Sequence, residues 1–189
     1  MMGSRKTSAK HQPLIKYATT ADFCAIFARH IDELYQLSFL LTADHQKAEE
    51  CFVAGLEDSA KDNHVFREWA RSWAKRAIIQ NAIRRINPHR DVSSFPLAPP
   101  PGILALPNDP GRHFEVEDVL ALEDFERFVF VISVLEHYSE HECSLLLGCS
   151  PRQIREAQVR AFARLLNSPV IMLPGKVPSE TIHEVVRQN

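Results

Sequence analysis

Residues 139–166, SEHECSLLLGCSPRQIREAQVRAFARLL, predict two helices joined by a tight turn. Ser139 and Glu142 have the spacing of a capping box, in which a hydroxyl and a carboxylate satisfy the free amides at the start of a helix. Gly148 suits the left-handed conformation that ends a helix. Ser150 then caps a second helix, because serine is a preferred residue before the first helical turn. The stretch therefore predicts a helical pair with a short connection.

The second of these helices is both amphipathic and basic. Two capped helices around a glycine turn, the second one basic, form the sequence pattern of a helix-turn-helix. In DNA-binding versions the first residues of the second helix meet base edges in the major groove. A plain helical hairpin with solvated arginines stays open as the alternative. The apolar positions are Ile154, Ala157, Ala161 and Leu165, and the arginines are Arg152, Arg155, Arg160 and Arg164.

Composition limits the classes of protein to consider. The 189 residues leave room for one domain or two small ones, and 45% hydrophobic with 24% charged residues is typical of a soluble globular protein. The net charge of −2 argues against a generally basic nucleic-acid binder, so such a function would need local patches. We expect no membrane span, no secretory signal and a cytoplasmic location. The four cysteines lack CxxC spacing and are expected to be buried free thiols: Cys24, Cys51, Cys143 and Cys149.

The distribution of prolines divides the chain. Seven prolines between Pro88 and Pro110 exclude a long helix or a central strand there. The predicted fold class is therefore all-α, with two small helical domains joined by a Pro-rich linker, the C-terminal one a helix-turn-helix. The predicted parts are a flexible arm (1–19), a helical domain (20–87), the linker (88–113), a helical domain (114–167) and a C-terminal tail (168–189).

In the first domain, an apolar pattern from Phe23 to Leu41 predicts a helix with a break inside it, capped by Thr20 or Asp22. Asp44 is expected to cap a helix over residues 45–59. In the second domain, residues 128–135 are almost wholly apolar, so periodicity alone leaves a buried strand open. The length of the run and its continuation into residues 139–166 favour a buried helix.

Residues 65–86 form the second informative stretch. Between Phe66 and Arg90 seven cations stand against one carboxylate, and Trp69 and Trp73 lie among them. Cations neutralise phosphates and exposed rings stack on unpaired bases, so this face suits nucleic acid. A core position for both tryptophans, with arginines that only face solvent, stays open as the alternative.

The order of these parts resembles the ECF (extracytoplasmic-function) sigma factors of the sigma-70 family, over about residues 23–166. Residues 40–50, with Leu-Leu-Thr-Ala-Asp and then Ala-Glu-Glu, are similar to that family's turn and Ala-Glu-Asp segment. Residues 66–85 resemble the helix that melts and reads the −10 promoter element. Residues 138–165 resemble the segment that leads into the −35 recognition helix and that helix itself.

This resemblance implies a protein that directs RNA polymerase to promoters, without catalysis or a cofactor. Its partners would be promoter DNA and RNA polymerase core, with an anti-sigma protein as a further candidate. Arginine pairs with guanine and glutamine with adenine in the major groove, and other cations clamp phosphates. The implied DNA-binding residues are Arg152, Gln153, Arg155, Arg160 and Arg164 in the C-terminal domain and Arg71, Lys75, Arg76, Asn81, Arg84 and Arg85 in the N-terminal domain, and the implied polymerase-binding residues are Glu49 and Glu50.

Two departures from the family support an alternative. The family's Asp-x-x-Gln, used to dock on polymerase, is replaced by Glu50 and Val53, and its Ser-Arg-Leu in the recognition helix is replaced by residues 156–158, Glu-Ala-Gln. A carboxylate facing a polyanion costs affinity. The alternative is a degenerate sigma-like scaffold that acts as a protein-interaction or regulatory module without promoter recognition.

A metal site is the third possibility. His137 and His141 lie four residues apart, close to Cys143 and Cys149, which is a ligand set that zinc accepts. Ser139, however, should begin a new helix between the two histidines and break their shared face. We therefore predict no metal. We also predict no catalytic residue, because no nucleophile has a base at a recognisable spacing.

Overall fold

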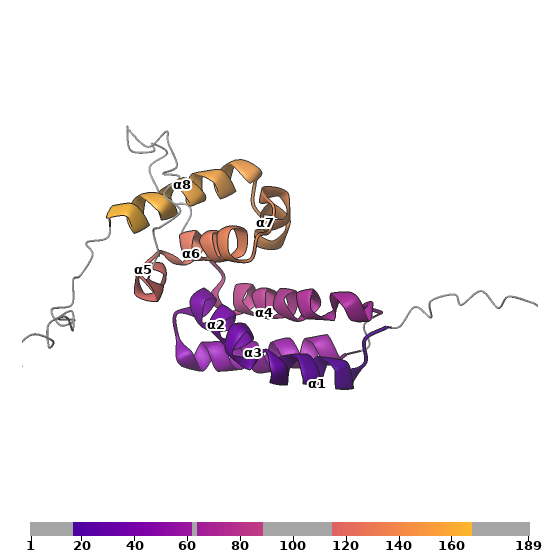
Figure 1. The fold of residues 1–189 in the computed structure, drawn as a ribbon. Coiled ribbons are helices and arrows are strands. Elements are labelled where there is room, and N and C mark those ends of the chain that lie inside the picture. Colours follow the sequence, from indigo (N-terminus) through magenta and orange to yellow (C-terminus); the bar gives the residue numbers. More distant parts are fainter. Residues whose placement is uncertain (1–16, 62–63, 89–114, 168–189) are drawn as a thin grey trace, which may run out of the picture.

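The computed structural model describes residues 17–61, 64–88 and 115–167. In these ranges the protein is all-helical, with eight α-helices and no strand; an isolated bridge joins Tyr17 to Phe66. Two clusters, α1–α4 and α6–α8, are separated along the chain by residues 89–114 (Figure 1). The predictions for most of the N-terminal arm, most of the Pro-rich linker and the C-terminal tail lie outside the described residues.

The N-terminal cluster begins with two helices, as the predicted break implies. The break lies at His30, which leaves helical geometry at φ −116° and ψ 31°. The predicted caps Thr20 and Asp22 are wrong: Thr19 is the cap, and Asp22 is its partner three residues on. The helices are α1 (Thr20–Arg29), α2 (Ile31–Thr42), α3 (His45–Ala60) and α4 (Ala70–Ile86), with a 3₁₀ turn η1 (Arg67–Trp69) before α4.

The long helices α3 and α4 touch closely at a glycine. A Cβ at Gly55 would lie 2.6 Å from the Cγ1 atom of Ile78, which is closer than real Cβ contacts. Asp44 caps α3 as predicted, and its Oδ1 atom accepts a hydrogen bond of 2.9 Å from the Lys47 amide. The cluster therefore has a defined helix start and a tight helix–helix contact near its middle.

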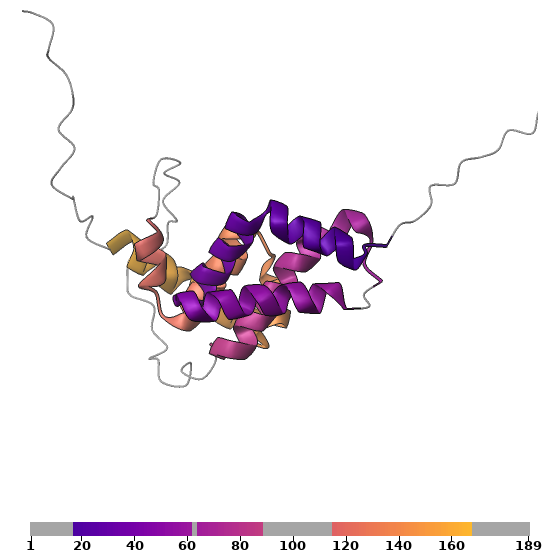
Figure 2. The same cartoon turned by 90° about the horizontal axis from the view of Figure 1, so that it is seen from below.

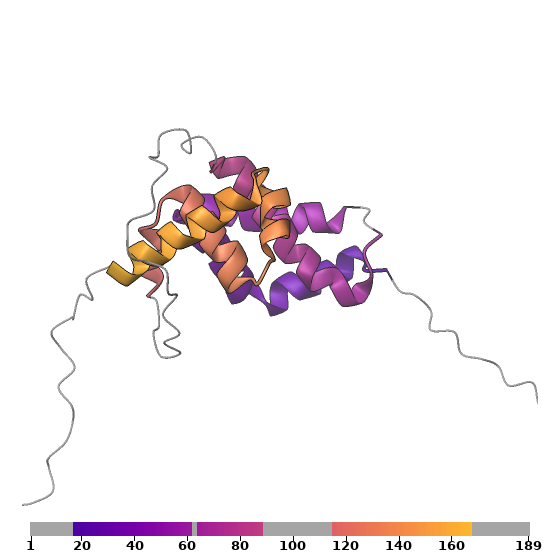
Figure 3. The ribbon, with the colours of Figure 1, turned by 90° about the horizontal axis from the view of Figure 1, so that it is seen from above.

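The C-terminal cluster confirms the predicted helical pair and its caps. Ser139 and Glu142 form the capping box, and Gly148 ends α7 at φ +64°. Residues 128–135 are helical, as favoured over a strand, with a π-helical turn over their second part. Seen from above, α8 crosses the outside of this cluster (Figure 3). The elements are α5 (Val116–Leu120), α6 (Asp124–Phe130), η3 (Val131–Leu135), α7 (Glu140–Leu147) and α8 (Pro151–Asn167).

The two clusters share one hydrophobic core. Buried side chains of α2 and α4, such as Leu41 and Ile78, belong to the same packed group as Phe128 and Ile154 of α6 and α8. The buried guanidinium of Arg127 donates to the carbonyl oxygens of Leu122 (2.9 Å) and Leu41 (3.4 Å), and the second bond joins the clusters. Figure 2 shows the opposite side, where α1 and α3 cover this core from below.

The expectation of four buried thiols is partly wrong. Cys51 and Cys143 are buried, Cys149 is half-buried, and Cys24 is exposed, because α1 turns Phe23 and Phe27 toward the core instead. Burial raises the pKa of the Cys143 thiol to about 11, so this thiol stays protonated at neutral pH. None of the helices within the described ranges has both the length and the apolar character required to cross a bilayer.

Candidate nucleic-acid interface

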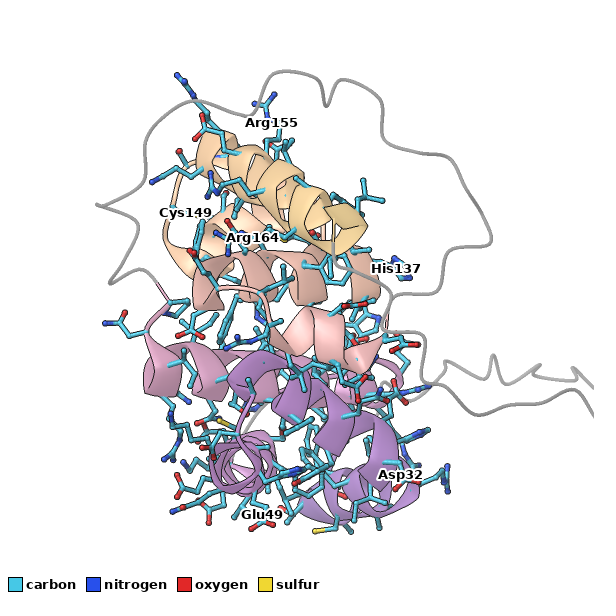
Figure 4. The ribbon with its side chains drawn as sticks, turned by 90° about the vertical axis from the view of Figure 1, so that its left-hand side faces the viewer. Asp32, Glu49, His137, Cys149, Arg155 and Arg164 are labelled. Carbon is cyan, nitrogen blue, oxygen red and sulfur yellow. The ribbon has the colours of Figure 1, made fainter. Side chains whose placement is uncertain are left out.

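The start of α8 presents two arginines to solvent. The side chains of Arg152 and Arg155 are 73% and 66% exposed. Arg155 projects from the outer side of α8, away from the N-terminal cluster (Figure 4). Each guanidinium pairs with a carboxylate through its Nε atom, Arg152 with Glu156 at 2.8 Å and Arg155 with Glu140 at 3.0 Å. Exposed pairs of this kind contribute about 0–1 kcal/mol, so both arginines remain accessible to a stronger acceptor.

Gln153 has a second role besides the predicted contact with bases. Its side-chain Oε1 atom accepts hydrogen bonds of 2.9 Å from both the backbone amide and the hydroxyl of Ser150. The backbone amide of Gln153 donates to that hydroxyl at 3.3 Å. This is the capping box of α8. A bidentate contact with adenine uses the oxygen and the nitrogen of a glutamine amide, so it would compete with the cap.

The other two arginines of α8 face the protein. Arg160 Nε lies 2.8 Å from Glu126 Oε1, and Arg164 pairs with Glu123 (2.6 Å) and with Glu126 Oε2 (3.1 Å). Glu126 is only 2% exposed. Its Oε2 atom is close to Arg164 but outside hydrogen-bond alignment, and it accepts no hydrogen bond from the described residues. Burial raises the pKa of Glu126 despite the arginine beside it. The two predicted phosphate clamps therefore fasten α8 to α6.

The basic face of α4 is paired with carboxylates of its own cluster at several points. Asn81 donates to Asp58 at 3.0 Å, and this aspartate also pairs with Arg84 at 2.7 Å. Hydrogen bonds from Lys61 and Asn81 lower the pKa of Asp58 to about 2. Two further pairs join Arg71 with Glu33 and Arg85 with Glu50. Phosphates would have to compete with these carboxylates for the cations.

Lys75 is the most enclosed of the predicted α4 cations for which a carboxylate partner is described. Its side chain is 21% exposed, and its Nζ atom lies 2.7 Å from Glu33 and 2.8 Å from Glu136. Burial alone would lower the Lys75 pKa, but the hydrogen bonds to Glu136 and Glu33 outweigh it and raise that pKa. Glu136 follows η3, so this ion pair is a polar link between the two clusters.

An open groove of about 840 Å³ lies beside Lys75. One wall comes from η1 and α4, including Trp69, Trp73 and Arg76, and the other comes from the segment before α7 and its first turn, including Tyr138 and Glu142. Trp69 is 59% exposed and Trp73 is also exposed, so the alternative with both tryptophans in the core is not what the structure shows. Hydrogen bonds from Ser139, assisted by Arg76, lower the pKa of Glu142, so this wall carries negative charge.

The predicted polymerase-binding residues lie on α3. Glu49 is exposed, and Glu50 is half-buried and paired with Arg85. Val53, one turn further on, is exposed as well. Glu49 and Arg155 lie at opposite ends of the molecule (Figure 4), so the two predicted interaction surfaces would not overlap.

The histidines and cysteines of the third possibility form no metal site in the part of the chain that the structure describes. There, no group of three or more His, Cys, Asp and Glu side chains is placed to hold a metal ion. His137, at φ +59°, lies before the N-cap Ser139 and therefore outside α7, as the predicted cap implies.

The carboxylate partners of the basic residues were not predicted from the sequence. Glu33 and Glu136 meet Lys75 from helices far apart in the chain, so their proximity is not visible in any local pattern. The acidic residues at the start of α6 were a usable signal, because Glu123 and Glu126 lie three residues apart, a spacing that lets both meet arginines of a neighbouring helix.

No protein-family model matches this sequence, and no curated protein matches it significantly.

Proposed function

We propose that this protein is a sigma-like transcription factor that binds duplex DNA through the α7–α8 pair, which then acts as a helix-turn-helix, and associates with RNA polymerase core in the cytoplasm. The observation that carries the proposal is the exposure of Arg152 and Arg155 at the start of α8. The first residues of a recognition helix are those that meet base edges, and arginine is the usual reader of guanine.

The contacts described above suggest different roles for the residues that the sequence predicted to bind DNA. Arg152 and Arg155 are the proposed base-reading residues, and Gln153 is assigned to the α8 cap. Arg160 and Arg164 contribute to affinity indirectly, by holding α8 on α6 through Glu126. The aromatic groove with Trp69 and Trp73 is the proposed place for an opened strand, since exposed rings stack on unpaired bases.

Selection from a random pool of duplex DNA tests the proposal. The full chain should enrich a preferred duplex, and the double substitution Arg152→Ala and Arg155→Ala should abolish the preference. Each bidentate base contact supplies about 1–3 kcal/mol of discrimination. The matched control is Arg29→Ala with Lys47→Ala, which removes the same charge from exposed sites on α1 and α3. Unchanged preference after loss of Arg152 and Arg155 would refute the proposal.

One observation favours a second candidate, a partner-binding module without promoter recognition. Val53 exposes an apolar side chain beside Glu49 and Glu50, at the position where the sigma family carries its docking glutamine. Such a change fits a partner other than polymerase. Affinity capture with the full chain and purified RNA polymerase core separates the two: binding that Val53→Gln leaves intact or strengthens supports the first candidate, and absence of binding supports the second.

A further inference from the structure

The arginines of this protein differ in which edge of the guanidinium their carboxylate partners occupy. Arg152 donates a hydrogen bond to Glu156 through Nε, and Arg155 Nε lies 3.0 Å from Glu140 in an ion pair. Arg164 pairs through both terminal nitrogens: Nη2 donates to Glu123, and Nη1 lies 3.1 Å from Glu126 Oε2 in an ion pair. On α4, Arg84 is likewise engaged at a terminal nitrogen, by Asp58.

This difference decides what each side chain can still bind. A guanidinium is a planar fork with five N–H donors. A carboxylate at Nε leaves the outer edge, formed by the two terminal nitrogens, for another acceptor. The O6 and N7 atoms of guanine need two parallel donors of that kind. The two terminal nitrogens of Arg164 are both paired with carboxylates of the protein. In the described pairs of Arg152 and Arg155, the carboxylate contacts Nε and not the terminal nitrogens.

The two carboxylates come from different elements: Glu156 accepts a hydrogen bond from Arg152 Nε, and Glu140 forms an ion pair with Arg155 on the same Nε side. Glu140 is the first residue of α7 and reaches Arg155 across the turn, and Glu156 reaches Arg152 from one turn further along α8. An arginine held in one orientation before binding loses less rotamer freedom when it meets a base. The same two carboxylates repel phosphates, so their effect on total affinity is unfavourable.

We propose that Glu156 and Glu140 are positioning residues for sequence selectivity: by holding the Nε edges of Arg152 and Arg155, they present the outer edges of both guanidinium groups to bases. The inference rests on the proposed function. It assigns a role to Glu156, whose charge otherwise only opposes DNA binding. These carboxylates lower the affinity for every duplex. They raise the ratio of the affinity for the preferred duplex to the affinity for a duplex with a changed base pair.

The test uses the preferred duplex selected by the full chain, together with duplexes changed at single base pairs. Glu156→Asp retains the charge but withdraws the carboxylate by one methylene group. We expect it to lower discrimination at one base pair by roughly threefold or more, a part of what a full bidentate contact supplies. Glu156→Gln should lower the same ratio while raising affinity for all duplexes, because one repulsive charge is lost.

A double-mutant cycle separates positioning from direct contact. With Arg152→Ala present, Glu156→Gln should no longer change the ratio. An equal change in both backgrounds would mean that Glu156 itself contacts the base, and a wild-type ratio for Glu156→Asp would mean that only its charge matters; either result overturns the inference but leaves the proposed function intact. Failure to enrich any duplex overturns both.

Discussion

The basic residues of α4 and those at the start of α8 look alike in the sequence but are held differently in the structure. Lys75 is enclosed by two carboxylates from two clusters, and Arg84 shares Asp58 with Asn81. Arg152 and Arg155 are exposed, and each has one half-buried partner. The number of basic residues in a stretch therefore does not show whether that stretch can bind nucleic acid. The position and burial of the carboxylate partners decide whether a basic side chain stabilises the fold or remains available to a ligand.

The largest expected effect is at the buried carboxylate that separates the two kinds of arginine within α8. Glu126→Ala removes a buried side chain and the carboxylate that Arg160 and Arg164 share. We expect it to lower the free energy of unfolding by about 3 kcal/mol, because it leaves a cavity and takes away the acceptor that fastens α8 to α6. Glu123→Ala, at a partly exposed partner of Arg164, should cost less than about 0.5 kcal/mol. Urea unfolding measures both; equal losses would contradict the assigned burial.

The next largest loss of stability is expected at two glycines, Gly55 in the N-terminal cluster and Gly148 in the C-terminal cluster. Gly55→Ala would push a methyl group against Ile78, and we expect a loss of about 1–2 kcal/mol, because overpacking outweighs the better helix propensity of alanine. Gly148→Ala meets no neighbour within 4 Å but has φ +64°, so it should cost about 1 kcal/mol through backbone strain alone. Pairing Gly55→Ala with Ile78→Ala should be less than additive, whereas Gly148→Ala with Ile78→Ala should be additive.

A third prediction tests the comparison between α4 and α8 directly. Lys75→Gln removes a half-buried cation from between Glu33 and Glu136 and should lower the free energy of unfolding by about 1 kcal/mol. Arg152→Gln removes an exposed cation and should change it by less than about 0.5 kcal/mol. Thermal unfolding of the two variants at equal ionic strength provides the measurement. The comparison fails if both substitutions cost the same.

The smallest predicted effect is a loss of folding stability at low pH. The pKa of Asp58 is about 2 in the folded protein, against 3.8 ordinarily, so its contribution is fully present above pH 4 and is lost as the pH falls toward 2. Because this side chain is partly exposed, the contribution should be under about 1 kcal/mol. Asp58→Asn should flatten the stability profile across that window. An unchanged slope between pH 4 and pH 2 would show that Lys61 and Asn81 do not hold the carboxylate.

Local chemistry made much of the fold predictable. The caps at Asp44 and Ser139 were correct, because a capping side chain acts on amides only two or three residues away. The break at His30 was located only loosely, since its apolar flanks fit one helix as well as two. The shared core was not predicted: the sequence suggested two separate domains, and contacts such as Arg127 with Leu41 join residues 86 positions apart.

The sequence predicted which types of residue form the candidate site, but not which carboxylates these residues pair with. Periodicity correctly put Arg152 and Arg155 away from the apolar side of α8. It could not distinguish them from Arg160 and Arg164, which also avoid the core stripe, because that distinction depends on the buried position of Glu126 on a neighbouring helix. Ion pairs between helices depend on tertiary distances that no spacing in the sequence encodes.

The placement of the aromatic residues has a practical consequence. The chain contains two tryptophans, and both line the groove between α4 and the segment before α7. The intrinsic fluorescence of the unlabelled protein is therefore an optical report on this one region. An oligonucleotide that stacks there should quench the emission, and a duplex bound only through Arg152 and Arg155 at the start of α8 should leave it unchanged, so a single titration would show which of the two surfaces a nucleic acid has reached.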